Sequence, residues 1–392
     1  MPDGAVGGQR DGSVLFFNEG VTAMAVFEKM EQLVPLLKEA GYEAVFIAPS
    51  PDLEYICGLD CLPDERFKGL LVTDRGRFFF MTPKLYLEEM SGIAGDPSLC
   101  EVWEDHEGFV GAFINGCKKV GLESGKIAFN DAVRAVDMLK ISAAMDGIVC
   151  CDGEELISPL RSVKTEEEIS LMGKAAKVAD DTLAEVVKYI RPGVTERWIE
   201  GKLTEIHNDL GKGVCRHISH IVASGPNAAL PHYNGGERVI GERDVVLIDF
   251  AGRYGSYFSD MTRTFFVGEP SEEEKKIYEI VLEAQTAGER AVHAGVSAGE
   301  VDRVVRKVIE EAGYGDYFPY RVGHGVGISV HETPFIKAFN KHILRPGNVF
   351  SIEPGIYLPG KFGVRIENLV AVGYDGTAVV LNKLPKSMLV LS

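Results

Sequence analysis

Two aspartates in the C-terminal half of the chain stand where a sequence normally places apolar residues. Asp249 follows the apolar run Val245–Ile248, and Asp260 lies 11 residues further on, beyond a turn marked by Gly252 and Gly255. Asp has a poor propensity for strands, so its position in a buried run needs a reason. Two carboxylates on adjoining strands can face each other, and they repel unless a cation or a proton lies between them. The pair favours a metal site, although a single buried Asp more often caps a helix or ends a turn.

Three more residues could join this pair. His324 lies between glycines, which let the backbone approach a ligand closely. Glu353 ends an apolar run and precedes Pro-Gly, so it is held at the end of a strand. Glu367 lies two residues after Arg365 in the segment 363–370, which is expected to form one strand, so their side chains share a face. For this last pair, a salt bridge on a solvated surface is the alternative interpretation.

The complete set contains four carboxylates and one imidazole: Asp249, Asp260, His324, Glu353 and Glu367. Such hard, oxygen-rich ligands suit Mn²⁺, Mg²⁺, Fe²⁺ or Co²⁺ better than a structural thiolate zinc site does. Four carboxylates carry too much negative charge for one divalent ion, whereas two ions balance them. Because pairs of metal ions support hydrolysis, the set predicts a two-metal hydrolase.

Composition narrows the possible partners. The chain has 392 residues and a net charge of −17, which disfavours nucleic acid and anionic membrane surfaces as partners. No apolar run is long enough for a transmembrane helix, and the start of the chain lacks a signal-peptide pattern. Seven cysteines, among them Cys57 and Cys61 without a second pair at zinc-ribbon spacing, indicate reduced structural thiols and a cytoplasmic location.

The elements that must position the site fall into two domains. A flexible tail over residues 1–20 precedes an α/β domain over 21–157, and a C-terminal domain covers 160–392. Periodicity and turn residues within the first domain predict helices over 25–41 and 132–142, strands over 43–50, 118–123 and 126–129, and a hairpin over 69–83 that turns at 74–76.

The C-terminal domain contains an internal repeat. Residues Thr165–Glu168 have the form of a capping box and open a helix expected to reach Ile190. Residues Ser271–Glu274 have the same form 106 residues later, and the helix stops at 191–195 and 293–297 are 102 residues apart. Caps and glycine stops are common, so coincidence is the alternative. Two similar halves would create a cleft, where ligands often bind.

Four motifs in this domain carry a family resemblance. The segments SDMTRTF, GHGVG, IEPGIY and GVRIEN occur in this order, and their spacing resembles that of the pita-bread metallopeptidases, which include methionine aminopeptidase, aminopeptidase P and prolidase. The resemblance implies an α+β protein with a C-terminal pita-bread fold of pseudo-twofold halves. It also implies a smaller α/β creatinase-like N-terminal domain, in which residues 51–58 look like a strand motif.

The resemblance implies a role for each metal ligand. Asp260 and Glu367 would bridge two ions, Asp249 would complete one ion, and His324 with Glu353 would complete the other. Glu353 would also accept the proton of the water that is activated between the ions. The implied cofactor is a pair of divalent ions, with Mn²⁺ favoured and Co²⁺, Fe²⁺ or Zn²⁺ as alternatives.

The resemblance also implies residues that contact the substrate. His232 falls where the family places a substrate-binding or proton-donating histidine, and His331 matches one that contacts the substrate carbonyl. Arg365 matches an arginine of aminopeptidase P and prolidase. Tyr320 replaces a frequent family histidine. Tyrosine can still donate a hydrogen bond to the substrate, but it does not change charge near neutral pH.

These features favour the proline-directed branch of the family. Methionine aminopeptidases match only the C-terminal domain, and creatinase lacks the metal ligands. The chain is therefore expected to be a cytoplasmic homodimer that hydrolyses Xaa-Pro dipeptides. The alternatives are an aminopeptidase P that acts on longer Xaa-Pro peptides, a hydrolase or lyase of small non-peptide molecules, and a catalytically silent binding protein.

Overall fold

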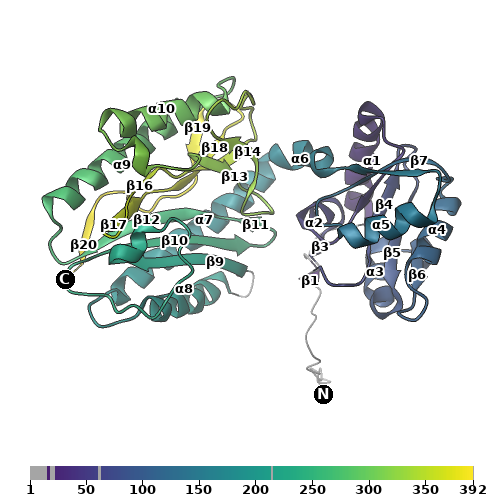
Figure 1. Ribbon diagram of the computed structural model, residues 1–392, viewed down its shortest axis with the longest axis horizontal. Coiled ribbons are helices and arrows are strands. Elements are labelled where there is room, and N and C mark those ends of the chain that lie inside the picture. The colour runs from purple at the N-terminus through teal and green to yellow at the C-terminus, as the bar shows by residue number, and fades with distance from the viewer. Residues whose placement is uncertain (1–15, 18–22, 61–62, 213–214, 392) are drawn as a thin grey trace, which may run out of the picture. The chain divides into compact units, whose positions relative to one another are not determined.

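The computed structural model describes residues 16–17, 23–60, 63–212 and 215–391. These residues form two compact units, with the division between Ile157 and Ser158, inside helix α6 (Glu154–Ser162) (Figure 1). The predicted tail over 1–20 lies outside the described residues except for strand β1 (Phe16–Phe17), which pairs antiparallel with β3 (Leu59–Asp60). The domain limits 21–157 and 160–392 stay predictions.

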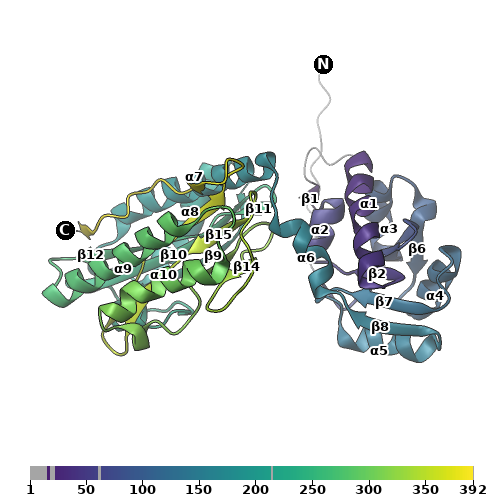
Figure 2. The same ribbon diagram turned by 90° about the horizontal axis from the view of Figure 1, so that it is seen from above.

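The first unit is built on one mixed six-stranded sheet. Its strand order is β6-β5-β4-β2-β7-β8, and the β2-β4-β5 pairings are antiparallel while the others are parallel. Helices cover both faces, with α1 and α5 on opposite sides of the sheet in Figure 2. The strands are β2 (Ala44–Ile47), β4 (Gly69–Thr73), β5 (Phe78–Pro83), β6 (Cys100–Trp103), β7 (Gly125–Phe129) and β8 (Ile148–Asp152), and the helices are α1 (Ala23–Ala40), α3 (Leu87–Ala94), α4 (Val110–Lys119) and α5 (Ala135–Ala144).

Two predictions for this unit are wrong. Residues 51–58 form helix α2 (Pro51–Cys57), because Ser50 caps its first turn and Gly58 ends it with a φ of 71°. The predicted strand over 118–123 does not form, since α4 extends to Lys119 and buries Phe113 and Cys117 on one face. The hairpin predicted around 74–76 is present as β4 and β5.

Five of the described cysteines are buried or half-buried in the first unit. Cys100, Cys117, Cys150 and Cys151 are free thiols, the Cys57 thiol donates to the Leu53 carbonyl at 3.0 Å, and Cys61 lies outside the described residues. No helix in the described part of the chain is long and apolar enough to cross a membrane.

The first half of the second unit contains two helices and a sheet with long strands. The predicted capping box forms, since the Thr165 hydroxyl accepts from the Glu168 amide while the Glu168 carboxylate accepts from the Thr165 amide. The α-helix ends earlier than predicted, and a 3-10 turn continues it over Val187–Tyr189. Strand β10 pairs antiparallel with both β9 and β12. The elements are α7 (Glu166–Val186), α8 (Glu196–Gly211), β9 (Cys215–Ser224), β10 (Asp244–Tyr254), β11 (Tyr257–Phe258) and β12 (Met261–Val267).

The second half repeats the helix pair and joins it to shorter strands. Ser271 and Glu274 form the second capping box. Strands β13, β14, β15, β18 and β19 form one sheet, β16 and β17 pair separately, and β20 (Leu389–Leu391) joins β12. The elements are α9 (Glu272–Ala291), α10 (Ala298–Glu311), β13 (Gly323–Gly325), β14 (Glu332–Ile336), β15 (Val349–Ile352), β16 (Gly355–Leu358), β17 (Phe362–Arg365), β18 (Asn368–Val372) and β19 (Ala378–Val380).

Each half has its own apolar core between helices and strands. In the first half, Leu183 and Leu203 pack with Ile248, whereas in the second half Val281 and Val305 lie in one core with the strands β15 to β18. In Figure 1, α9 and α10 lie above these strands and α8 lies below them. The predicted repeat of two helix pairs with sheets is therefore present.

One predicted strand of the second half is divided. The segment 363–370 forms two strands in different sheets, with a break at Ile366 and Glu367. The break arises because the Glu367 amide donates to the Thr262 carbonyl at 3.1 Å and the Ile366 amide donates to the Pro354 carbonyl. Both residues therefore leave the ladders on either side.

Candidate active site

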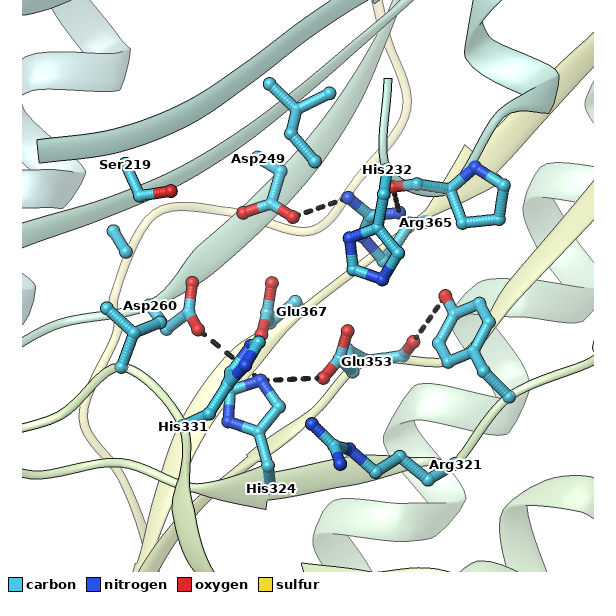
Figure 3. A pocket seen from close by; sticks show the side chains of 15 residues that line it. Ser219, His232, Asp249, Asp260, Arg321, His324, His331, Glu353, Arg365 and Glu367 are labelled. Atoms are coloured by element: carbon cyan, nitrogen blue, oxygen red, sulfur yellow. Dashed lines mark hydrogen bonds and ion pairs between the residues drawn. The ribbon is translucent and has the colours of Figure 1, made fainter. Parts of the chain in front are cut away.

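One pocket of about 530 Å³ in the second unit contains every predicted site residue (Figure 3). Its wall is formed by strands and loops of both halves, and it includes one further charged residue, Arg321, that the sequence analysis did not select. The predicted residues that line it are His232, Asp249, Asp260, Tyr320, His324, His331, Glu353, Arg365 and Glu367.

The carboxylates come from strands and strand ends. Asp249 lies within β10 opposite Thr262 of β12, and Asp260 immediately precedes β12. Glu353 follows the last residue of β15, and Glu367 lies in the break between β17 and β18. A strand end frees a side chain from the alternation of the sheet, so these carboxylates can turn toward one centre.

His324 faces two of these carboxylates. Its Nε2 lies 3.1 Å from Glu353 Oε1 and 3.7 Å from Asp260 Oδ2. Its Nδ1 lies 3.1 Å from the carbonyl oxygen of Gly325, which only accepts, so in the neutral ring Nδ1 carries the proton and Nε2 presents a lone pair. A lone pair and a carboxylate oxygen at 3.1 Å need a proton or a metal ion between them.

The oxygen atoms of Glu367 have different surroundings. Oε2 accepts a hydrogen bond of 2.7 Å from the Thr262 hydroxyl, whereas Oε1 is buried with no hydrogen-bond partner in the described part of the molecule. An unsatisfied buried oxygen costs about 1–3 kcal/mol or more when it is charged. A cation beside Oε1 would remove this cost. Ligand atoms of Asp260, His324 and Glu367 all lie within 4.8 Å of one another.

The electrostatics of the cluster also fit a bound cation. Burial and the charges of Glu367 and Asp249 raise the pKa of Asp260 well above its usual range. Burial and the charge of Glu353 raise the pKa of Glu367 in the same way. A raised pKa means that the ionised form of each carboxylate is disfavoured, and a bound cation would offset the repulsion between them. The donor set therefore fits divalent metal ions.

Arg365 holds Asp249 in place. Its guanidinium forms an ion pair with Asp249 Oδ2, and its other N–H groups donate to the hydroxyls of Tyr357 at 2.6 Å and Thr262 at 3.1 Å and to the Pro231 carbonyl at 3.3 Å. Burial by itself would lower the pKa of Arg365, but Tyr357 and Asp249 raise it well above the usual value. Each nitrogen of the Arg365 guanidinium thus has a partner within the protein.

Glu353 is positioned by its neighbours on both sides. Ser351 Oγ donates to Glu353 Oε1 at 3.0 Å, and the Tyr320 hydroxyl donates to the Glu353 carbonyl oxygen at 3.3 Å. Burial alone would raise the pKa of Glu353, but the hydrogen bond and charge of His324 lower it. Glu353 therefore differs from Asp260, whose pKa is raised.

Two predicted histidines and one tyrosine line the pocket around the cluster. The ring centre of His331 lies 4.1 Å from that of His324, at an interplanar angle of 66°. His232 lies on the segment that follows the 3-10 turn Gly225–Ala229. The Tyr320 hydroxyl lies 2.5 Å from that of Tyr357, so this predicted substrate contact is already bonded within the protein.

Three parts of this region were not predicted from the sequence. Tyr357 lies inside the quoted segment IEPGIY, and Arg321 directly follows Tyr320, so nearby signals existed for both. The third is a buried ion cluster behind His331, in which Glu332 accepts from Lys164 and from Arg161 at 2.6 Å. These cations lie 168 and 171 residues before Glu332, which leaves no local signal.

Comparisons with known proteins cover both units. The pattern of "Metallopeptidase family M24" matches residues 170–373, and that of "Creatinase/Prolidase N-terminal domain" matches residues 29–163. Over 360 residues the chain is 36% identical to a Mycobacterium tuberculosis protein named probable dipeptidase PepE. The alignment covers 90% of this chain and 93% of that protein.

Solved structures of similar proteins agree with these matches. A prolidase from Thermococcus sibiricus aligns with a TM-score of 0.87 at 36% identity, over 93% of this chain and 98% of that one. An X-Pro aminopeptidase from Thermotoga maritima aligns with a TM-score of 0.80 at 32% identity, over 92% of this chain and 99% of that one.

Proposed function

The chain belongs to metallopeptidase family M24, and on this premise we propose that it is a two-metal hydrolase that cleaves Xaa-Pro dipeptides. Its fold is the predicted one, a pita-bread domain with pseudo-twofold halves behind a creatinase-like N-terminal domain. The family and its relatives establish a prolidase-like metallopeptidase that uses divalent metal ions. Our proposal concerns the number of ions, the identity of the metal and the substrate.

The observation that carries the proposal is the set of unsatisfied ligand atoms at the centre of the pocket. His324 Nε2 faces carboxylate oxygens of Asp260 and Glu353, and Glu367 Oε1 is buried without a hydrogen-bond partner in the described part of the chain. In Figure 3, Asp260 and Glu367 lie between Asp249 on one side and His324 with Glu353 on the other. This arrangement supports two ions that share Asp260 and Glu367.

Each residue of the cluster has a chemical task in this proposal. Asp260 and Glu367 would hold both ions, Asp249 would complete one set of ligands, and His324 with Glu353 would complete the other. Bound ions of this kind stabilise negative charge that develops on an oxygen and make water more acidic. The carboxylate of Glu353, which lines the pocket, would accept the proton of the attacking water. Arg365 keeps Asp249 in its ligating position.

The substrate groups meet the remaining pocket residues. His232 and His331 supply ring nitrogens that can donate to the carbonyl before proline or protonate the leaving nitrogen. The Tyr320 hydroxyl acts differently, since its bonds to the Glu353 carbonyl and to Tyr357 support the wall of the site. We propose Mn²⁺ as the metal, because carboxylate-rich sites favour it over softer ions.

The test is a substrate-length assay with a metal series. The full chain is treated with chelator and dialysed, then assayed on Ala-Pro and Ala-Pro-Gly with Mn²⁺, Co²⁺, Fe²⁺ or Zn²⁺. We expect hydrolysis of Ala-Pro that needs added metal, is highest with Mn²⁺ and reaches its maximum at two ions per chain by metal analysis. If activity reached its maximum at one ion per chain, the two-metal proposal would be wrong. If neither peptide were hydrolysed, the chain would be neither an Xaa-Pro dipeptidase nor an aminopeptidase for longer Xaa-Pro peptides.

A second candidate is an aminopeptidase that acts on longer Xaa-Pro peptides. It is supported by the likeness to the Thermotoga maritima protein titled X-Pro aminopeptidase. The same assay separates the two, because that candidate requires Ala-Pro-Gly to be cleaved with the higher kcat/KM.

A further inference from the structure

The ring of His331 reaches the centre of the site without support from a hydrogen bond. In Figure 3 it lies beside the ring of His324, and the two ring centres are 4.1 Å apart. His331 is exposed, and its ring forms neither a hydrogen bond nor an ion pair with any residue in the described part of the chain. His324 differs, because its Nδ1 donates to the Gly325 carbonyl. The position of the His331 ring therefore depends on the backbone that carries it.

That backbone is anchored by the next residue, Glu332, whose side chain is 7% exposed. Neighbouring side chains project to opposite sides of a strand, and at the start of β14 His331 lines the pocket whereas Glu332 does not. Glu332 Oε1 accepts from Lys164 Nζ, and Oε2 accepts from a terminal nitrogen of Arg161 at 2.6 Å. Both oxygens of this buried carboxylate are thus held by cations.

Arg161 contacts the chain on both sides of His331. One terminal nitrogen of its guanidinium donates to the Ser329 hydroxyl at 2.8 Å and to Glu332 at 2.6 Å. These acceptors lie two residues before His331 and one residue after it. A single guanidinium therefore ties together the short segment from which the ring projects.

The two cations come from a segment that is itself fixed. Arg161 lies in the last turn of α6, and Lys164 follows three residues later. The Lys164 amide donates to the Gly347 carbonyl at 2.8 Å, and its carbonyl accepts from the Tyr374 hydroxyl at 2.9 Å. The Lys164 side chain is only 1% exposed. The support of Glu332 thus belongs to the folded interior of the second unit.

The loop between His324 and His331 leaves room for this carboxylate. A Cβ atom placed on Gly327 would overlap Glu332 Oε1. Because cations hold both of its oxygens, the carboxylate cannot turn aside, and a side chain at position 327 would displace it or the loop. The glycine-rich segment that follows His324 therefore packs directly on the ion cluster.

A buried ion cluster is weak evidence for stability, since lost hydration offsets much of the attraction between its charges. Its clearer effect is on geometry, because charge-assisted hydrogen bonds are short and directional. Here these bonds join the end of α6 to residues on both sides of His331. A ring that acts on a substrate carbonyl needs such a support, because a displacement of about 1 Å can cost about 100-fold in rate.

We propose that Arg161 and Lys164 act through Glu332 to hold the ring of His331 in position beside the proposed metal ligands. All three are positioning residues, since none of them lines the pocket. The assignment rests on the proposed function, in which His331 donates to the carbonyl before proline. It extends the active site to the segment that leads from α6 into the second unit.

The test is a double-mutant cycle on Arg161 and His331, measured on Ala-Pro with the metal-loaded full chain. Arg161→Met leaves Lys164 paired with Glu332, so the carboxylate keeps a buried cation. We expect this variant to lower kcat by about 10-fold with KM within about twofold, because a displaced ring weakens contacts made in the transition state. In a His331→Ala background, the same change should lower kcat by no more than about twofold.

Lys386 provides a matched control. It pairs with Glu289 at 2.6 Å, and that carboxylate keeps a hydrogen bond from Asn368 when Lys386 is replaced. Neither member of this half-buried pair lines the pocket. Lys386→Met should therefore leave kcat within about twofold, and denaturant unfolding of both variants separates lost stability from lost activity. Arg161→Lys should restore part of kcat, because an ammonium at this position can still pair with Glu332.

Three kinetic results would contradict the assignment while the hydrolase activity stands. Equal losses of kcat from Arg161→Met in the wild-type and His331→Ala backgrounds would show a merely structural role. A loss of similar size after Lys386→Met would show that breaking any such ion pair has this effect. Full activity of His331→Ala would show that the ring has no task for which it must be positioned.

A crystal structure of Arg161→Met gives a readout that does not depend on turnover. We expect the His331 ring to move by about 1 Å or more, or to lose its order. An unchanged ring beside His324 would overturn the assignment. If the wild-type holoenzyme did not hydrolyse Ala-Pro, the proposed function would fail, and the ring position in this variant would still decide whether the cluster holds His331.

Discussion

The two halves of the catalytic unit begin alike and end differently. Each opens with a capping box and a pair of helices, α7 and α8 in one half and α9 and α10 in the other. The first half continues into β9 and β10, which are 10 and 11 residues long, whereas β13 to β18 of the second half contain three to five residues each. Similar helical supports therefore carry two kinds of sheet.

The difference shows how a site is made from a repeat. The long strand β10 supplies a continuous wall, and Asp249 projects from it at a regular position. The short strands of the second half leave Glu353 and Glu367 at their ends, free to turn toward the centre. Asp249 therefore projects from a continuous strand, whereas strand ends direct Glu353 and Glu367 toward the centre.

Two buried histidines, one in each half, differ in the groups that surround them. His207 lies in α8 of the first half, 1% exposed, with its ring 5.1 Å from that of Phe250. His324 in the second half, 3% exposed, faces Asp260 and Glu353. The same residue type thus fills space in one half and presents a ligand atom in the other, since only the second has carboxylates opposite.

The largest expected effect comes from removing one ligand from either half. Bound divalent ions contribute several kcal/mol to transition-state stabilisation, so Asp260→Asn and Glu367→Gln should each lower kcat/KM by at least about 1,000-fold, or about 4 kcal/mol. The metal-free variants should unfold at the same or a higher denaturant concentration than the metal-free wild type, because a buried like charge has been removed. If Asp260→Asn kept its activity while Glu367→Gln lost it, the second half would form the site without a ligand from the first.

A smaller effect is expected from His207 as the pH falls. Burial lowers the pKa of His207 from 6.5 to about 4. Between these values the unfolded chain binds a proton that the folded protein does not, so stability falls as the pH falls through this window. The wild type should lose up to about 3 kcal/mol relative to His207→Gln between pH 6.5 and 4, measured by denaturant unfolding.

A matched control for this pH effect is His106, whose side chain is 72% exposed. His106→Gln replaces a solvated ring and should change the free energy of unfolding by no more than about 0.5 kcal/mol. Parallel stability curves for wild type and His207→Gln would contradict the assignment of His207 as a histidine buried in neutral form.

The smallest expected effect tests whether the two helical supports are equivalent. Thr165→Ala and Ser271→Ala each remove one capping hydroxyl, which costs about 1 kcal/mol of unfolding free energy. Both should reduce stability to a similar degree without changing kcat. Ser170→Ala, at an exposed position inside α7, is the control and should change little. A large loss at one cap only would show that the halves are supported differently.

Much of the fold followed from signals within a few residues. Both capping boxes, the β4–β5 hairpin and the repeated helix pair were predicted because each depends on neighbours in the chain. The errors arose where a local signal was incomplete. For residues 51–58 the strand was expected from the family resemblance, whereas the cap at Ser50 and the turn at Gly58 decide in favour of a helix.

The same distinction between local and long-range signals applies to the active site. Residue types and motif order identified all five proposed ligands, since carboxylates within apolar strands are unusual in any context. The division of 363–370, the pairing of Arg365 with Asp249 and the ion cluster around Glu332 came only from the tertiary structure. Asp249 and Arg365 are 116 residues apart, and Thr262 and Glu367 are 105 apart. Such contacts depend on how the two halves pack, which no spacing in a single sequence encodes, whereas caps, turns and ligand types act within a few residues.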